Sequence, residues 1–232
     1  MAIVTDGLTY NLDASVLLLS GFSDNQTLLD AYVPDEVNVN GWYGSAGYSL
    51  YVAASGQGSN SVIRFNTGNL AFKNPDEFLS YTALTVQIAA KRTGASYTNT
   101  WMGLFSTWFN YAESGLTILA ITDNANTRNY SGWGTYGGIT TTQSTSSMPL
   151  DTPIVVTATI SPATSGSFYT NSTSTGTFTN SKAQGYFGVG GLESAQGFFV
   201  GDLYQVLIYN RELSEAEIIQ NAETLRDKWF ST

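Results

Sequence analysis

Short segments in which apolar and polar residues alternate recur along the chain, and they constrain its fold more than any other feature. Leu84, Val86 and Ile88 alternate with polar Thr85 and Gln87, which is the period of a strand with one buried face. Leu116, Ile118 and Ala120 repeat the pattern, and further β-rich segments lie at residues 62–65, 154–160, 167–170, 186–189 and 198–209. Many strands at spacings of about ten residues favour an all-β sandwich or barrel.

One helix is predicted, at residues 214–229. Ser214 and Glu217 have the spacing of a capping box, in which the hydroxyl accepts from the Glu217 amide and the carboxylate reaches back to the Ser214 amide. Apolar residues then recur at spacings of four, three and four: Ile218, Ala222, Leu225 and Trp229. That stripe covers one face of a helix of about four turns, so we expect the helix to dock on the sandwich.

A chain of 232 residues fits one large domain or two small ones, because domains average roughly 150 residues. The dipeptides Thr93-Gly94 and Ser165-Gly166 predict turns. The polar run at 140–147 is uncharged, but strand-like sequence resumes at Ile154 without a change in composition, so we interpret the run as a loop. The expectation is a single domain over 1–232, with strands at about 3–209 and the helix at about 214–229.

Composition excludes several kinds of chemistry. The sequence contains no Cys and no His, which rules out a thiol nucleophile, disulfides, a Cys/His zinc site and a Ser-His-Asp triad built within this chain. The net charge of -9 argues against nucleic acid as a partner, because phosphate-binding surfaces are cationic. Apolar runs such as residues 16–19 are too short to insert in a membrane. The amino terminus lacks the features of a signal peptide, so export by that route is not expected.

The carboxyl-terminal segment, residues 201–214, reads GDLYQVLIYNRELS and continues into Glu217-Ile218 and Lys228-Trp229. Together with DGLTYNLDA at 6–14 and YFGVGG at 186–191, it resembles concanavalin A-like lectin/laminin G-like jelly-roll domains of the type found in phage and bacterial surface proteins. The resemblance implies an all-β, two-sheet antiparallel jelly-roll sandwich with one C-terminal amphipathic helix. It also implies binding by loops along a sandwich edge, but no particular activity, because the fold carries lectins, glycosidases, adhesion modules and virion proteins.

Glycosidases of that superfamily carry two carboxylates on one strand, commonly as Glu-x-Asp, because alternation then puts both on the same face. The sequence has no Glu-x-Asp. The pairs Asp35-Glu36 and Asp76-Glu77 would point to opposite faces of a strand, and each follows a proline, which predicts turns. We therefore expect no catalytic residues and no enzymatic activity, with glycoside hydrolysis as the less favoured alternative.

Binding of a glycan needs aromatic rings for stacking and Asp or Asn side chains for the hydroxyl groups. The segment SGWGTYGG at 131–138 places two aromatic residues in a glycine-rich stretch, where burial is harder than in a strand. The candidates for binding a glycan or a protein partner are Trp133, Tyr136, Trp42, Tyr43, Trp101 and Trp108. The alternative for each of them is a place in the core or in a subunit contact.

Calcium is common in the superfamily and binds oxygen ligands. Asp123, Asn124 and Asn126 offer such ligands and form the candidate metal site, although Asx residues also dominate ordinary turns. In many relatives an acidic pair stands where this chain has Tyr204 and Gln205, so a metal at that strand is not expected. Calcium is therefore the one cofactor that the sequence suggests.

The Met-Ala start runs directly into the domain, as in phage structural proteins that carry this fold with no leader. We therefore expect a non-enzymatic phage virion surface protein, a capsid decoration or cement protein that is assembled in the host cytoplasm. Its partners are expected to be capsid subunits or surface glycans, bound through loops and sandwich edges, and homo-oligomers fit that role. The alternative is a free-standing carbohydrate-binding lectin that acts with or without calcium.

Overall fold

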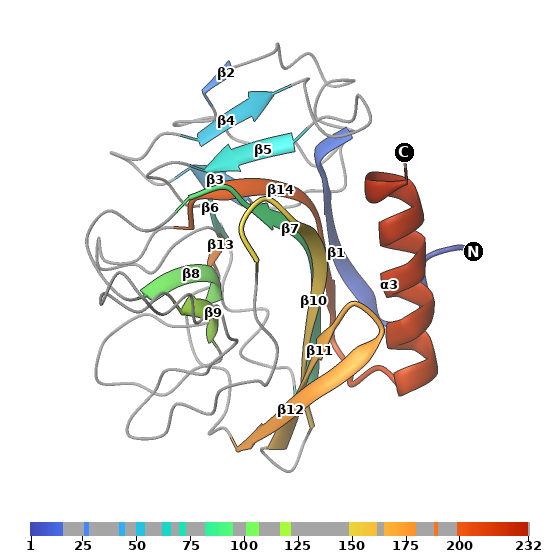
Figure 1. The fold of residues 1–232 in the computed structure, drawn as a ribbon. Helices are drawn as coiled ribbons and strands as arrows, with labels where there is room; N and C mark the ends of the chain where they lie inside the picture. The colour runs from blue at the N-terminus through green and yellow to red at the C-terminus, as the bar shows by residue number, and fades with distance from the viewer. Residues whose placement is uncertain are drawn as a thin grey trace.

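The computed structural model describes residues 1–15, 26–27, 42–44, 50–53, 62–65, 70–72, 82–94, 101–106, 117–121, 149–161, 165–179, 188–189 and 199–231. In these ranges the chain forms two antiparallel sheets and a C-terminal helix (Figure 1). The helix, α3 (Glu215–Phe230), lies on one side of the larger sheet, and the smaller sheet lies on the other. The predicted two-sheet sandwich with a C-terminal helix is confirmed.

The larger sheet has nine strands. Its order is β12 (Thr173–Thr179), β11 (Ser165–Thr170), β10 (Pro153–Ile160), β7 (Leu84–Arg92), β14 (Gly201–Tyr209), β5 (Val62–Phe65), β4 (Leu50–Ala53) and β2 (Gln26–Thr27), with β1 (Leu8–Asp13) also paired to β14. β7 pairs with β14 along its length, whereas on the other side of β14 residues 201–203 pair with β5 and residues 205–209 with β1. β14 therefore joins the two halves of the sheet.

The smaller sheet has five strands. Its order is β3 (Trp42–Gly44), β6 (Leu70–Phe72), β13 (Gly188–Val189), β8 (Trp101–Ser106) and β9 (Thr117–Ile121). β13 sits in the middle and pairs antiparallel with both β6 and β8. Three segments far apart in the sequence are thus brought side by side.

The central strands of the larger sheet are buried on both faces. Val86, Ile88 and Ala90 are fully buried and share the face turned away from α3. On the other face Gln87 is equally buried, because its amide donates to the Ile218 carbonyl of α3 at 3.2 Å. The alternating pattern predicted one buried face, and the helix covers the polar face as well.

α3 begins as the sequence predicts. Ser214 is the N-cap, its hydroxyl accepts from the Glu217 amide, and the Glu217 carboxylate accepts from the Ser214 amide at 2.9 Å. The predicted apolar stripe is buried against the sheet: Ile218, Ala222, Leu225 and Trp229. No helix in the described ranges has the length and apolar character that a membrane span requires.

The predicted turn at Ser165-Gly166 is wrong, because both residues lie in β11. Gly166 pairs with Ile160 on one side and with Phe178 on the other. The Ser161 amide donates to the Ser165 carbonyl at 2.8 Å, so the connection between β10 and β11 ends before residue 165. Ser and Gly are common in turns, but both residues can also occupy the first positions of a strand, as they do in β11.

Candidate functional site

A buried ion cluster lies where β14 begins. Asp202 stands opposite Arg64 of β5 and opposite Lys91 of β7. Its carboxylate accepts from Arg64 Nε at 2.7 Å and Nη2 at 3.2 Å, and from Lys91 Nζ at 3.2 Å. Only 1% of the Asp202 side chain is exposed. One enclosed carboxylate is therefore paired with two cations, one from each neighbouring strand, and the three strands share this ion cluster.

Tyr204 lies between this cluster and the end of α3. Its ring packs at 5.6 Å from the ring of Trp229 and at 5.2 Å, edge to face, from the ring of Phe230. Its hydroxyl is enclosed and has no hydrogen-bond partner. Burial raises the pKa of this hydroxyl well above its usual value, and the neighbouring Asp202 carboxylate raises it further. The phenol is therefore neutral and does not serve as a base.

The second carboxylate on a described strand, Asp13 at the end of β1, is also engaged. It forms an ion pair with Lys228 of α3 and accepts from the Ser15 amide at 3.0 Å. Gln205 lies beside this pair, where its carbonyl oxygen accepts from Trp229 Nε1 at 2.9 Å. Both strand carboxylates thus lie on the side of the sheet that carries α3, and both are paired with cations.

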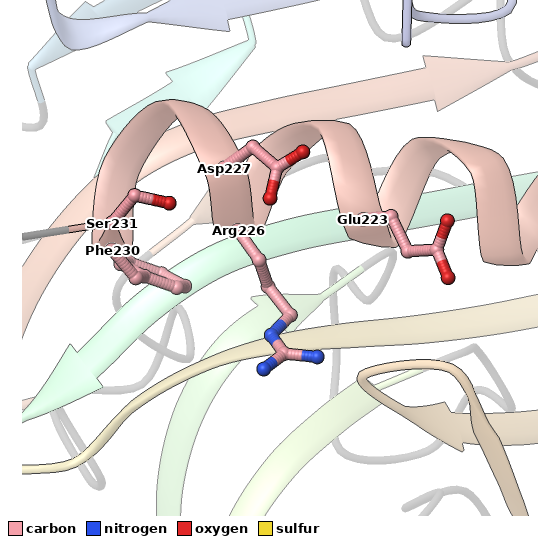
Figure 2. A pocket seen from close by; sticks show the side chains of 5 residues that line it. All are labelled: Glu223, Arg226, Asp227, Phe230 and Ser231. Carbon is pink, nitrogen blue, oxygen red and sulfur yellow. The ribbon is translucent and has the colours of Figure 1, made fainter.

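A polar groove runs along the exposed side of α3. Its volume is about 410 Å³, and it is lined by Glu223, Arg226, Asp227, Phe230 and Ser231. Figure 2 shows the Arg226 side chain extending away from both carboxylates. Within the described residues no ion pair or hydrogen bond joins these side chains. The groove can offer hydrogen-bonding groups and one aromatic edge to a hydroxylated ligand, but its charges face water and are screened.

The structure places three of the six predicted aromatic binding residues in the smaller sheet. Trp42 and Tyr43 lie in β3, and Trp101 begins β8. Trp108, Trp133 and Tyr136 lie outside the described residues, as do the candidate calcium ligands Asp123, Asn124 and Asn126. Among the residues that the structure does describe, no group of three or more acidic side chains could hold a metal ion.

The register decides which of these aromatic positions share a face. Cross-strand partners share a face, and neighbours along a strand alternate. Tyr43 pairs with Ala71, Ala71 with Gly188, and Gly188 with Ser106, so these four positions share a face. Phe105, the residue before Ser106, is buried in the core. Position 43 is therefore on the face opposite Phe105, and position 42 is on the same face as Phe105.

The pairing of β8 with β9 gives the face of position 101. Phe105 pairs with Ile118 and Met102 pairs with Ala120, so position 101 is opposite Phe105 as well. Positions 43 and 101 are three strands apart, which is about 14 Å at the usual strand spacing. Tyr43 is also level with the last residue of β8 and not with the first. These two positions share a face but do not form one cluster.

Comparison with known families decides the identity of the fold. The family model described as the concanavalin A-like lectin/glucanases superfamily matches residues 66–219. The chain belongs to this superfamily. The match runs from the connection before β6 into the first turn of α3, so it includes the middle of this lectin-like sandwich as well as β14. A comparison with curated proteins gave no significant match.

Solved structures share the lectin-like sandwich. The Trypanosoma rangeli sialidase in complex with 2,3-difluorosialic acid matches at a TM-score of 0.65 and 16% identity, over 100% of this chain and 35% of the sialidase. Domain 4 of AbnA, a GH43 extracellular arabinanase from Geobacillus stearothermophilus in complex with arabinotriose, matches at 0.61 and 12%, over 93% of this chain and 98% of that domain.

A third structure is the binding domain of Paraclostridial Mosquitocidal Protein 1. It matches at a TM-score of 0.57 and 15% identity, over 86% of this chain and 52% of that one. This chain spans about a third of the sialidase and nearly the whole of the arabinanase domain. At such identities the three likenesses show a shared fold.

Sequence reasoning did not find the Asp202 cluster. The only signal for it was the adjacent pair Lys91-Arg92, the one place where two basic residues are neighbours in the sequence. Alternation puts Lys91 on the same face as Gln87, but it does not show that Asp202 stands opposite. The pairing of β7 with β14 supplies that information.

Proposed function

We propose that this chain is a non-enzymatic domain that binds carbohydrate. The observation that carries the proposal is the state of the strand carboxylates: the described strands contain two, Asp13 and Asp202, and both are neutralised by cations beneath or beside α3. Glycoside hydrolysis needs two carboxyl groups about 5–10 Å apart on either side of the scissile bond. Neither of these carboxylates is free to act as an acid or a nucleophile.

Binding is supported by relatives of the fold. The superfamily includes lectins, and the arabinanase domain that this chain matches over nearly its whole length was solved with arabinotriose. The positions of the smaller sheet on the face opposite Phe105, 43 and 101, and the predicted loop residues Trp133 and Tyr136 are the candidates for stacking on sugar rings.

A glycan array probed with the purified chain, with and without calcium, tests the proposal. We expect binding to at least one class of glycan and no release of reducing sugar from it. Tyr43→Ala and Trp101→Ala should weaken binding without lowering the melting temperature. Trp42→Ala, the neighbouring position on the opposite face, is the matched control and should act mainly on stability. Absence of binding to every glycan, or hydrolysis of one, contradicts the proposal.

We further propose that the domain acts on the surface of a phage virion. The support is the segment 201–214, whose sequence resembles surface domains of phage and bacterial proteins. Mass spectrometry of purified particles tests this setting through the copy number of the chain per major capsid subunit. A fixed, symmetry-related copy number supports a decoration role, and absence from particles contradicts it.

A further inference from the structure

The face of the larger sheet that carries α3 continues past the helix onto β11 and β12. Gln87 marks this face, because its amide donates to the Ile218 carbonyl of α3 at 3.2 Å. Gln87 pairs with Thr157, and Thr157 pairs with Tyr169 of β11. Tyr169 in turn pairs with Ser174 of β12. Cross-strand partners share a face, so Tyr169 and Ser174 both lie on the side of α3.

A second row of partners runs parallel to the first. Thr159 of β10 pairs with Ser167, and Ser167 pairs with Thr177. Thr157 and Thr159 are buried in β10, which α3 contacts. Ser167 is half-buried, whereas Ser174 and Thr177 are exposed. The sheet therefore emerges from beneath the helix between β10 and its last strand, β12.

Four side chains form this emerging surface, which we call the edge platform: Ser167, Tyr169, Ser174 and Thr177. Tyr169 is half-buried, because it packs against the hydrophobic core while part of it stays exposed. An aromatic ring held in place by the core loses little freedom when a ligand stacks on it. The three hydroxyl groups around it can each donate and accept a hydrogen bond. This combination suits a sugar ring with its CH groups and hydroxyl groups.

Two carboxylates at the start of α3 lie near the edge platform. Burial raises the pKa of the Tyr169 hydroxyl, and the charges of Glu215 and Glu212 raise it further. Both glutamates are exposed, and within the described residues neither forms an ion pair. In Figure 1 the hairpin of β11 and β12 lies beside α3. These carboxylates can accept hydrogen bonds from hydroxyl groups of a ligand, and they repel anions.

The strands of the edge platform bring no charge of their own. No charged residue lies between Asp151 and Lys182 in the sequence, a segment that includes β10, β11 and β12. The charges identified near Tyr169 are therefore negative, as is the net charge of -9 of the whole chain. A sulfated sugar or a uronic acid would be repelled here, whereas a neutral sugar would not.

We propose that the edge platform binds a neutral oligosaccharide, with one sugar ring stacked on Tyr169 and its hydroxyl groups bonded to the platform hydroxyls and to Glu215. The inference rests on the proposed carbohydrate binding, gives it a surface on the larger sheet, and names the ligand class as uncharged. The surface is separate from positions 43 and 101, which belong to the smaller sheet.

Ser174→Arg and Thr177→Arg test the location, because each places a long side chain on the edge platform from an exposed position. We expect binding of a neutral oligosaccharide from a panel of arabinotriose, xylotetraose and cellotetraose to weaken by about tenfold in calorimetry. The melting temperature should not change. The matched control is Thr173→Arg: Thr173 is also exposed, but it pairs with Thr170, whose partner Val156 is buried on the face turned away from α3. It should bind as the wild type does.

Substitutions of Tyr169 test the stacking. Tyr169→Phe keeps the ring and should keep most of the affinity, whereas Tyr169→Ala removes the ring and should weaken binding by about tenfold. Tyr169 packs on the core, so the melting temperature of both variants is measured as well. If Tyr169→Ala does not fold, the comparison of Ser174→Arg with Thr173→Arg decides. Equal affinities of those two variants overturn the inference.

The charge of the ligand tests its class. Trigalacturonate and sulfated cellotetraose should bind at least about tenfold more weakly than the neutral oligosaccharides, and the difference should narrow as salt is added. The double substitution Glu212→Gln and Glu215→Gln should also narrow it. Acidic sugars that bind as well as neutral ones, in the wild type at low salt, contradict the assignment of an uncharged ligand.

The outcomes for the two proposals are distinguishable. Glycan binding that Ser174→Arg, Thr177→Arg and Tyr169→Ala leave unchanged overturns the edge platform and leaves carbohydrate binding in place at another surface. Absence of binding to every glycan overturns carbohydrate binding itself, and the edge platform with it.

Discussion

Asn221 is the one polar residue on the buried face of α3, and it connects three parts of the chain. Its carbonyl oxygen accepts from the Val4 amide at 2.8 Å, and its amide donates to Gln87 Oε1 at 2.7 Å and to the Tyr209 hydroxyl at 2.8 Å. The Tyr209 hydroxyl in turn donates to the Val4 carbonyl at 3.0 Å. The amino-terminal segment is thus bound to the helix and to β14 through one fully satisfied network.

Asn221→Ala should lower the free energy of unfolding by about 2–4 kcal/mol, because it leaves the buried Gln87 carbonyl and the part-buried Val4 amide without their partners. Urea denaturation measures this loss. Gln220→Ala is the matched control, since Gln220 makes one exposed hydrogen bond to the Ala2 carbonyl, and it should cost less than about 1 kcal/mol. Equal effects of the two substitutions would show that the network adds little.

Glu217 makes the stability of the helix start depend on pH. Its carboxylate accepts from Arg211 Nη2 at 2.6 Å and from the Ser214 amide at 2.9 Å. These hydrogen bonds, that from Arg211 first, lower the pKa of Glu217 from 4.5 to about 2. A lowered carboxyl pKa contributes stability above the unfolded value, and the contribution is lost as the pH falls through the folded value.

Glu217→Gln should therefore destabilise the protein by about 1 kcal/mol at pH 7. The difference from the wild type should shrink as the pH falls from 4.5 towards 2. Denaturation at a series of pH values measures both effects. Glu215→Gln, in the same first turn but without a described partner for its carboxylate, should change little at any pH. A difference that persists at pH 2 would contradict this role of Glu217.

At the level of elements, the pairing of β7 with β14 depends on Gly201. A Cβ there would lie 2.2 Å from a backbone oxygen of β7 and 2.8 Å from two atoms of the Phe199 ring. A backbone oxygen in a ladder cannot move aside without breaking the pairing. The close approach of the two strands therefore requires glycine.

Gly201→Ala should cost more than about 3 kcal/mol, because both the strand pairing and the Phe199 ring must shift. Gly94→Ala is the control: its Cβ would meet Val200 Cγ1 at 2.9 Å and no backbone atom, so the strand pairing can stay intact and the loss should be smaller than for Gly201→Ala. Thermal unfolding of the two variants compares the losses. A Gly201→Ala protein as stable as the wild type would show that the strands can separate at that point.

The sequence predicts the elements better than it predicts their partners. Alternation found β7, β-rich composition found β5 and β10, and the capping box and apolar stripe found α3 almost to the residue, because these signals are local. Strand pairing is not local: Leu8 pairs with Tyr209. For this reason the cross-strand ion cluster at Asp202 could not be found. The missing Glu-x-Asp is also a local signal, and the expectation of no acid pair for hydrolysis that rests on it stays a prediction.

The whole molecule carries a net charge of -9. Its positive groups in the described ranges are mostly used internally, as in the pairing of Arg211 with Glu217 and of Lys228 with Asp13. We expect no retardation of duplex DNA in an electrophoretic assay at low salt, where electrostatic binding is strongest. A shift that disappears as salt is added would contradict this expectation and point to a local basic surface.

The position of β14 also governs when the fold can form during synthesis. β1 is made first, but its only described strand partner is β14, and β7 and β5 meet only through the same strand. Until β14 has been synthesised, β1, the strands that pair through β5 and those that pair through β7 are not joined, and each group has open edges. The nascent chain must therefore avoid association through those edges for nearly the whole of its translation. We expect such a chain to expose open strand edges for longer during synthesis than one whose sheet grows strand by strand.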